Sequence, residues 1–292
     1  MNPVNLDDIR DAASLLDGVI RHTPSLSAGW IEKKYGVNVS FKCENLQRAG
    51  SFKIRGAYNR IARLSDTERA RGVVAASAGN HAQGVALAAQ ILGIEATIFM
   101  PMGAPLPKYQ ATLGYGATVK FHGKTIDETL LAAFEFSEQT GAIFIHPFDH
   151  EHIVAGQGTM GLEILEQNPD VKTVVVCTGG GGLLAGTALA IKSLRPDIKI
   201  IGVQAEMAAS YPPSLAAGSP QMLPRKQHAY VLFLQAVMNS QEFGFAKSEQ
   251  YLRKAIGLGL RTGQDNAVAR MHLAGICAQT GRRPEALALL AE

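Results

Sequence analysis

The sequence predicts an α/β protein with a parallel sheet in its first three quarters, followed by an all-α tail. Short β-branched runs alternate with segments of helical periodicity from about residue 72 to 146 and again from 171 to 204. Such alternation is typical of parallel strands whose connecting helices cover the sheet. Beyond about residue 224 no strand pattern recurs, and the remaining runs have helical spacing.

The first alternating unit is expected to hold four strands and three helices. Strands are expected at residues 72–77, 96–100, 117–122 and 142–146. Helices are expected at residues 80–92, 105–114 and 125–139. Pro101 ends the second strand and Gly114 closes the second helix. A further helical pattern begins at Lys53, before this series.

The second unit follows a long helix expected at residues 152–167. "VKTVVVCT", residues 171–178, is almost continuously apolar, as expected of a parallel strand buried on both faces. Four glycines, a helix at 183–194 and a strand at 198–204 complete the unit.

The tail begins where "GSPQMLPRKQ", residues 218–227, marks a boundary with two prolines and a glycine. Helices are expected at residues 228–238, 246–260, 266–280 and 283–292. Parts of the last three look like tetratricopeptide-type hairpins, although the matching positions hold only small and apolar residues. We therefore divide the chain into residues 1–224 and a helical tail, 225–292.

Composition excludes several classes of protein. The net charge of +3 is spread along the chain with no basic run, which argues against a nucleic-acid partner. No apolar run approaches the roughly 20 residues of a membrane span, and the polar N-terminus does not resemble a signal peptide. Three scattered cysteines, Cys43, Cys177 and Cys277, fit a reducing compartment. We expect a cytoplasmic protein.

The stretch "CTGGGGLLAG" indicates an anion site between the second-unit strand and its helix. Consecutive glycines let the backbone approach a ligand, and the helix N-terminus behind them favours a phosphate. The Lys-Ser/Thr ending of a nucleotide-hydrolysing P-loop is missing. A dinucleotide site is an alternative, because Gly180, Gly182 and Ala185 have the required spacing and Glu206 follows about 20 residues on.

Lys53, in "SFKIRG", is a candidate nucleophilic amine. A lysine must be neutral to act as a nucleophile, and its ordinary pKa of about 10.4 prevents that. Apolar neighbours such as Phe52 and Ile54 lower the pKa of an amine. On its own, the stretch also fits a solvated surface lysine.

Six motifs connect these features. They are "RHTPSL", "KCENLQRAGSFKIRGA", "ASAGNHAQGVALAA", "GAPLPK", "HPFDHEHIVAGQGTMGLEI" and "TGGGGLLAGTALAI". They occur in the order found in pyridoxal-phosphate enzymes of the tryptophan-synthase-β fold type. Over residues 4–224 the chain resembles the serine/threonine dehydratase family of these enzymes, and threonine dehydratases most closely. The resemblance implies a two-lobed fold, with the small lobe at about residues 45–147.

The resemblance also implies roles for individual residues. Lys53 would carry the pyridoxal 5'-phosphate as a Schiff base and act as the base at the substrate α-carbon, with Phe52 beside the cofactor. Asn80 would hydrogen-bond the cofactor's phenolic oxygen. The phosphate would be held by Gly179, Gly180, Gly181, Gly182 and the amide of Leu183. The substrate carboxylate would be bound by the loop of Ser77, Ala78, Gly79, Asn80 and His81. Alternatively, Asn80 is a helix N-cap, Ser77 only ends a strand, and His81 lies on the surface.

The implied activity is elimination of ammonia from L-threonine or L-serine, giving a 2-oxo acid, in a homo-oligomeric enzyme. Ala78 stands where serine racemases have an acid/base hydroxyl, which favours dehydration over racemisation. The pattern "SAGNH" differs from the threonine-serine-glycine-asparagine pattern of β-replacing synthases, which stay an alternative. Relatives with a divalent-cation site use two acids, whereas here Ser210 and Pro212 follow Glu206, so we expect no metal there.

The resemblance ends before the family's core is complete. That core continues for roughly another hundred residues and includes a serine-glycine-glycine segment at the pyridine nitrogen. Its absence here predicts an open sheet edge and uncovered apolar surface. The alternative function is therefore a catalytically impaired, cofactor-binding paralogue or fusion that acts through its helical tail.

Overall fold

A computed structural model describes residues 4–205, 210–218 and 245–258, together with residues 267, 269–271, 273–274, 276–277, 280 and 282–291. The chain divides into two compact units, Met1–Val203 and Gln204–Glu292. No helix in the described part of the chain has both the length and the apolar character needed to cross a membrane.

The first unit contains the predicted four-stranded parallel sheet. Its strand order is β5-β4-β3-β6, and every pairing is parallel. The strands are β3 (Val73–Ala76), β4 (Ala96–Met100), β5 (Thr118–Phe121) and β6 (Ile143–Phe144). The connecting helices are α5 (Asn80–Leu92), α6 (Leu106–Gly114) and α7 (Ile126–Thr140). The predicted alternation from residue 72 to 146 is therefore confirmed.

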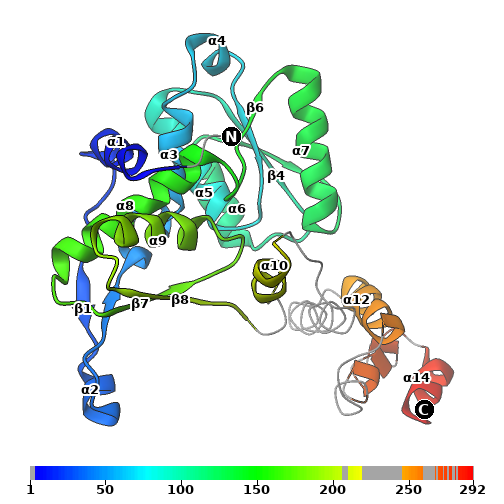
Figure 1. Ribbon diagram of the computed structural model, residues 1–292. Coiled ribbons are helices and arrows are strands. Elements are labelled where there is room, and N and C mark those ends of the chain that lie inside the picture. The colour runs from blue at the N-terminus through cyan, green and yellow to red at the C-terminus, as the bar shows by residue number, and fades with distance from the viewer. Residues whose placement is uncertain are drawn as a thin grey trace. The chain divides into compact units, whose positions relative to one another are not determined.

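Helices cover both faces of this sheet (Figure 1). Val74 and Phe99 point to the face covered by α7, where Ala133 packs against them. Val73 and Ile98 point to the other face, which α5 and α3 (Lys53–Ile61) cover. Strands β3 and β4 are thus buried on two sides, which explains why these two segments are apolar runs, whereas β5, at the edge of the sheet, is largely exposed.

A second, two-stranded parallel sheet pairs β7 (Thr173–Cys177) with β8 (Lys199–Val203). Helices α8 (Glu151–Gln167) and α9 (Gly182–Leu194) lie on one face of it, where Val174 and Val176 are buried. On the other face Val175 is 63% exposed and Val203 is 51% exposed. This uncovered apolar surface is what the incomplete core predicts.

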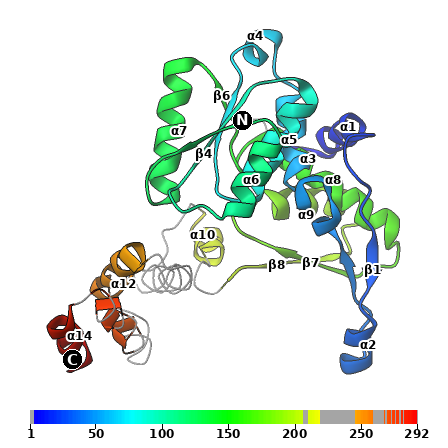
Figure 2. The same ribbon diagram turned by 180° about the vertical axis from the view of Figure 1, so that it is seen from behind.

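The N-terminal part adds short elements that the sequence pattern did not indicate. They are α1 (Leu6–Leu16), β1 (Ser25–Ser27), α2 (Gly29–Tyr35), β2 (Ser40–Lys42), the short helices η1 (Glu44–Leu46) and η2 (Arg48–Gly50), and α4 (Asp66–Arg69). Strands β1 and β2 form an antiparallel pair. Helix α1 packs against α8 and α9 through Ile9 and Ala12, both fully buried. Figure 2 shows α1 beside α3 and α8 from the opposite side.

A buried ionic network fixes the first turn of α3. Arg55 has no exposed surface and forms two hydrogen bonds with Glu44, of 2.8 and 2.9 Å, and two with Glu163, of 2.5 and 3.0 Å. Lys42 pairs with Glu163, and Thr23 donates to Glu44 at 2.6 Å. Two cations thus balance two carboxylates at a point that joins β2, η1, α3 and α8.

The described residues of the second unit are mostly helical. Its helices are α10 (Tyr211–Ala217), α12 (Phe245–Leu258) and α14 (Arg283–Ala291), and residues 267, 269–271, 273, 274, 276 and 277 are also helical. Leu252, Leu273 and Ala286 share one apolar cluster. Hydrogen bonds from Arg282 and Arg253 lower the pKa of Glu249 to about 2.

The described residues do not test two predictions for the tail, its starting point and its first helix. The two compact units are Met1–Val203 and Gln204–Glu292, and the predicted division of the chain at residue 224 stays a prediction. The helix expected at 228–238 lies outside the described residues, and the tetratricopeptide likeness stays a prediction.

Candidate functional site

Lys53 is the first residue of α3, and its side chain is partly buried. Nζ donates to the carbonyl oxygen of Pro147 at 2.6 Å and lies 5.4 Å from the centre of the Phe52 ring. Burial lowers the pKa of Lys53 to about 8. This hydrogen-bond partner is a carbonyl and not a carboxylate, so it brings no negative charge that would oppose loss of the proton.

Helix α5 lies close against Lys53 because Gly84 has no side chain. A Cβ at Gly84 would lie 3.0 Å from the Lys53 carbonyl carbon and 3.1 Å from its Cβ. The start of the same helix carries the loop of Ser77, Ala78, Gly79, Asn80 and His81. Tight packing between α3 and α5 therefore places the lysine and this loop in one region.

Within that loop the three polar side chains have different surroundings. Ser77 Oγ accepts from the Gly79 amide at 3.1 Å. Asn80 is exposed and accepts at Oδ1 from Lys108 Nζ at 2.7 Å. The cap of α5 is Gly79, so the alternative interpretation of Asn80 as the N-cap is wrong.

His81 is buried, so the alternative of a surface residue is also wrong. Its Nε2 lies 2.9 Å from the carbonyl oxygen of Ile145. A carbonyl only accepts, so the proton is on Nε2. Burial, reinforced by the charge of Lys53, lowers the pKa of His81 to about 3. The imidazole is neutral at physiological pH and anchors the loop to the end of β6.

The glycine loop joins β7 to α9 and meets the segment that follows β6. A Cβ at Gly180 would lie 2.2 Å from the Phe148 ring, and one at Gly182 would lie 2.7 Å from the Phe148 carbonyl oxygen. Gly181 has φ = 91°, in the left-handed region that favours glycine. Phe148 follows Pro147, the partner of Lys53, so residues 147–148 connect the lysine to the glycine loop.

This donor set fits a pyridoxal phosphate. The lysine amine has a lowered pKa, as Schiff-base formation requires. The first turn of α9 has no side-chain cap, and the space beside Gly179 is open, so a phosphate can approach the backbone amides up to Leu183. In the described part of the chain no group of three His, Cys, Asp or Glu side chains could hold a metal ion.

Of the acid positions considered for a cation, Glu206 lies outside the described residues. Ser210 caps α10 and Pro212 lies in its first turn.

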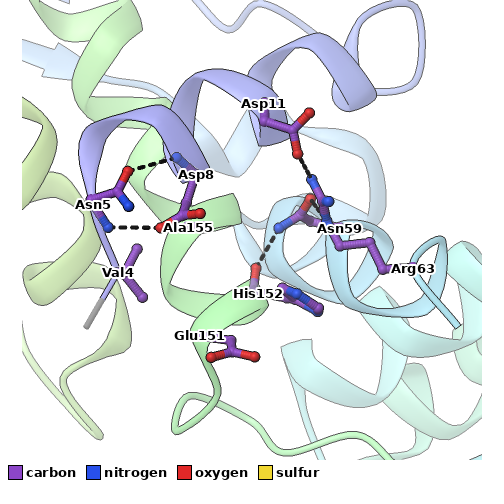
Figure 3. Close-up of a pocket in the computed structure, with 9 residues that line it drawn as sticks. All are labelled: Val4, Asn5, Asp8, Asp11, Asn59, Arg63, Glu151, His152 and Ala155. Carbon is purple, nitrogen blue, oxygen red and sulfur yellow. Dashed lines mark hydrogen bonds and ion pairs between the residues drawn. The ribbon is translucent and has the colours of Figure 1, made fainter. Parts of the chain in front are cut away.

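A pocket of about 280 Å³ lies elsewhere, between α1, α3 and α8 (Figure 3). It contains none of the predicted site residues. Several of its polar groups bind one another: Asn59 donates to the His152 carbonyl oxygen at 2.6 Å and accepts from Arg63 at 3.0 Å, and Arg63 pairs with Asp11. We interpret it as a structural junction of three helices.

Sequence reasoning missed the contacts of Pro147, Phe148 and Lys108. These residues lie within the motifs "HPFDHEHIVAGQGTMGLEI" and "GAPLPK". No local pattern, however, indicates that a lysine bonds a backbone carbonyl 94 residues away or a side-chain amide 28 residues away.

Comparison with known proteins now bears on this geometry. The family described as "Pyridoxal-phosphate dependent enzyme" matches residues 16–275. The chain belongs to this family. Membership removes the basis of the dinucleotide alternative and accounts for a lysine and a glycine loop in one site.

Among curated proteins, the chain is 52% identical over 223 residues to L-threonine ammonia-lyase of Thermotoga maritima, which covers 76% of this chain and 56% of that protein. It is 51% identical over 204 residues to the catabolic L-threonine dehydratase TdcB of Staphylococcus aureus N315, covering 70% and 59%. Among solved structures, maize serine racemase superposes with a TM-score of 0.73 at 40% identity, covering 76% and 67%. The chain thus spans little more than half the length of these two curated relatives.

Proposed function

We propose that the chain binds pyridoxal 5'-phosphate at Lys53 and eliminates ammonia from L-threonine or L-serine. The observation that carries the proposal is the Lys53 amine, with a pKa of about 8, beside the Pro147–Phe148 segment that also contacts the glycine loop. The likeness to threonine ammonia-lyases supports the choice of substrate.

When bound, the cofactor supplies an electron-withdrawing ring that makes the proton on the substrate α-carbon acidic. The residues of this chain would do the rest. Lys53 Nζ takes up that proton, and the amides of Ser77–His81 orient the substrate carboxylate. The glycine loop holds the phosphate. The α-proton and the β-hydroxyl together leave as one water, and hydrolysis of the released enamine gives ammonia with 2-oxobutanoate from threonine or pyruvate from serine.

The deciding experiment combines labelling and turnover. The purified chain is incubated with pyridoxal phosphate, reduced with borohydride and mapped by mass spectrometry, while 2-oxobutanoate is measured with threonine present. We expect the label on Lys53 and turnover that disappears in Lys53→Ala. The proposal fails if no label is found on Lys53.

A serine racemase is a second candidate, favoured by the maize structure. Ala78 lacks the hydroxyl that racemases carry at this position, so we expect dehydration to exceed racemisation. Chiral chromatography of L-serine incubations measures both products.

A cofactor-binding protein without activity is a third candidate, favoured by the incomplete coverage of the relatives and by exposed Val175 and Val203. Lys53 labelling without any turnover of threonine or serine would support it. We also propose that the protein is a cytoplasmic homo-oligomer, since its three cysteines are free and this apolar face is uncovered. Light scattering and cell fractionation test these two points.

A further inference from the structure

Lys108 contacts the Asn80 side chain from a separate helix. Its Nζ donates to Asn80 Oδ1 at 2.7 Å. In the part of the chain that the structure describes, no ion pair joins Lys108 to a carboxylate. A carboxylate would bind a lysine more strongly than a neutral amide does. The hydrogen bond of Lys108 to the Asn80 amide therefore indicates that Lys108 orients this amide.

The position of Lys108 is set by the packing of α6. Thr112 is fully buried and donates to the Lys108 carbonyl oxygen at 2.8 Å. Tyr109, the next residue, packs on the apolar core beneath α5 and contacts the Phe121 ring at 5.2 Å between centroids. The backbone of Lys108 is therefore held in place by the packing of α6, and only its side chain can move.

An ammonium group has only donors, so it must face the oxygen of the Asn80 amide. This contact settles which end of the amide is oxygen, which is otherwise ambiguous for asparagine. The Nδ2 group, with its two donors, is consequently turned away from Lys108. The positive charge also polarises the amide and strengthens those donors.

We propose that Lys108 is a positioning residue that holds Asn80 as a hydrogen-bond donor toward an anionic oxygen of the bound cofactor. This inference rests on the proposed function, in which Asn80 meets the phenolic oxygen of pyridoxal phosphate. Lys108 itself does not touch the reacting atoms. It prevents an exposed amide from rotating and presenting its own oxygen to an anion.

The first test needs no cofactor. In ¹⁵N-labelled protein the Asn80 side-chain amide signals are identified by their loss in Asn80→Ala. In Lys108→Met these signals should move and show faster motion, whereas Lys108→Arg should restore them. Lys192→Met, which removes an exposed lysine bonded to the Pro196 carbonyl at 2.9 Å, is the matched control. Unchanged Asn80 signals in Lys108→Met would overturn the proposal.

The second test measures cofactor affinity by absorbance titration. We expect Lys108→Met to bind pyridoxal phosphate about fivefold to tenfold more weakly, the effect of one lost or misaligned hydrogen bond. Lys108→Arg and Lys192→Met should resemble the wild type. In an Asn80→Ala background, Lys108→Met should have no further effect, because Lys108 acts through Asn80.

The outcomes separate the two proposals. If Lys53 is labelled and the Lys108→Met effect persists undiminished in Asn80→Ala, the positioning role is wrong while the proposed function stands. A raised KM for threonine with unchanged cofactor affinity also refutes it, because Lys108 would then bind substrate directly. If Lys53 is not labelled, the proposed function fails and the role of Lys108 toward the cofactor fails with it, while the cofactor-free measurement still shows whether Lys108 orients the Asn80 amide.

Discussion

Replacing Arg55 by methionine tests how the start of α3 is held in place. Arg55 has no exposed surface, and the side chains of Glu44 and Glu163 are each only 10% exposed. Methionine fills similar volume but leaves two buried carboxylates with one cation, Lys42. Breaking a buried ion pair from one side costs about 3–5 kcal/mol. That is a large part of a typical stability of about 5–15 kcal/mol.

The assay is urea unfolding followed by circular dichroism. With a slope of about 2 kcal/mol per molar urea, the midpoint should fall by about 1.5–2.5 M. Arg195→Met is the matched control, since it removes an arginine–carboxylate pair with Asp197 whose side chains are 37% and 55% exposed. Solvent screening makes such a surface pair worth about 0–1 kcal/mol.

The pH dependence of the Arg55→Met effect has a definite sign. Burial alone would raise the pKa of Glu163, but the hydrogen bond and charge of Arg55 lower it. The ionised Glu163 therefore stabilises the folded state at pH values above the pKa of the unfolded chain. This contribution is lost as the pH falls through the lower pKa of the folded state. In the variant, Lys42 alone opposes the effect of burial, so the pKa of Glu163 should rise. The difference between variant and wild type should therefore shrink toward about pH 4, near the ordinary carboxylate pKa. A loss no larger than that of Arg195→Met, or one that does not vary with pH, would refute this account.

Three further predictions follow from single contacts. Labelling of Lys53 by pyridoxal phosphate and borohydride should be half-maximal near pH 8 and decline below it, because the pKa of about 8 leaves the amine mostly protonated at lower pH; half-labelling above pH 10 would contradict this. Gly180→Val should lower cofactor affinity and cost about 1–3 kcal/mol in urea unfolding, since its Cβ would lie 2.2 Å from the Phe148 ring. Phe148→Ala should restore part of that loss, and absence of any rescue would place the clash elsewhere. Asn59→Leu should cost about 1–3 kcal/mol, because the half-buried His152 carbonyl loses its 2.6 Å donor; a midpoint equal to that of the wild type would show that water replaces it.

The sequence was sufficient for the elements whose stability is local or depends on apolar runs. Strands β3 and β4 are buried on both faces and β7 on one, so their apolar runs stood out. Lys53 could be selected because its own neighbours, Phe52 and Ile54, are apolar. The short strands β1 and β2 carry no such run, since Phe41 is exposed and the strands are held by pairing with each other.

The sequence could not show where charged and polar residues are buried. Arg55, Glu44 and Glu163 are individually typical surface residues, and only their mutual pairing across more than a hundred residues compensates their loss of water. His81 likewise looks exposed at the start of a helix, yet the Ile145 carbonyl gives it a buried partner. Burial of polar groups depends on long-range partners, and a local pattern contains no information about them.

The connection between β6 and α8 explains why separate motifs form one site. Its backbone carbonyls at Ile145 and Pro147 accept from His81 and Lys53, and Phe148 lies against the glycine loop. His146 holds the turn itself, since its Nδ1 accepts from the Phe148 and Asp149 amides at 3.3 and 2.7 Å.

That arrangement requires a neutral His146, because a protonated Nδ1 cannot accept a hydrogen bond. Burial lowers the pKa of His146, and the charge of Lys53 acts in the same direction, so the turn keeps its acceptor at neutral pH. A displacement of these few residues would move the lysine, the asparagine loop and the phosphate loop together. One short connection thus fixes their relative geometry. Any residue type could supply its backbone carbonyls, so the residue types alone do not reveal this role.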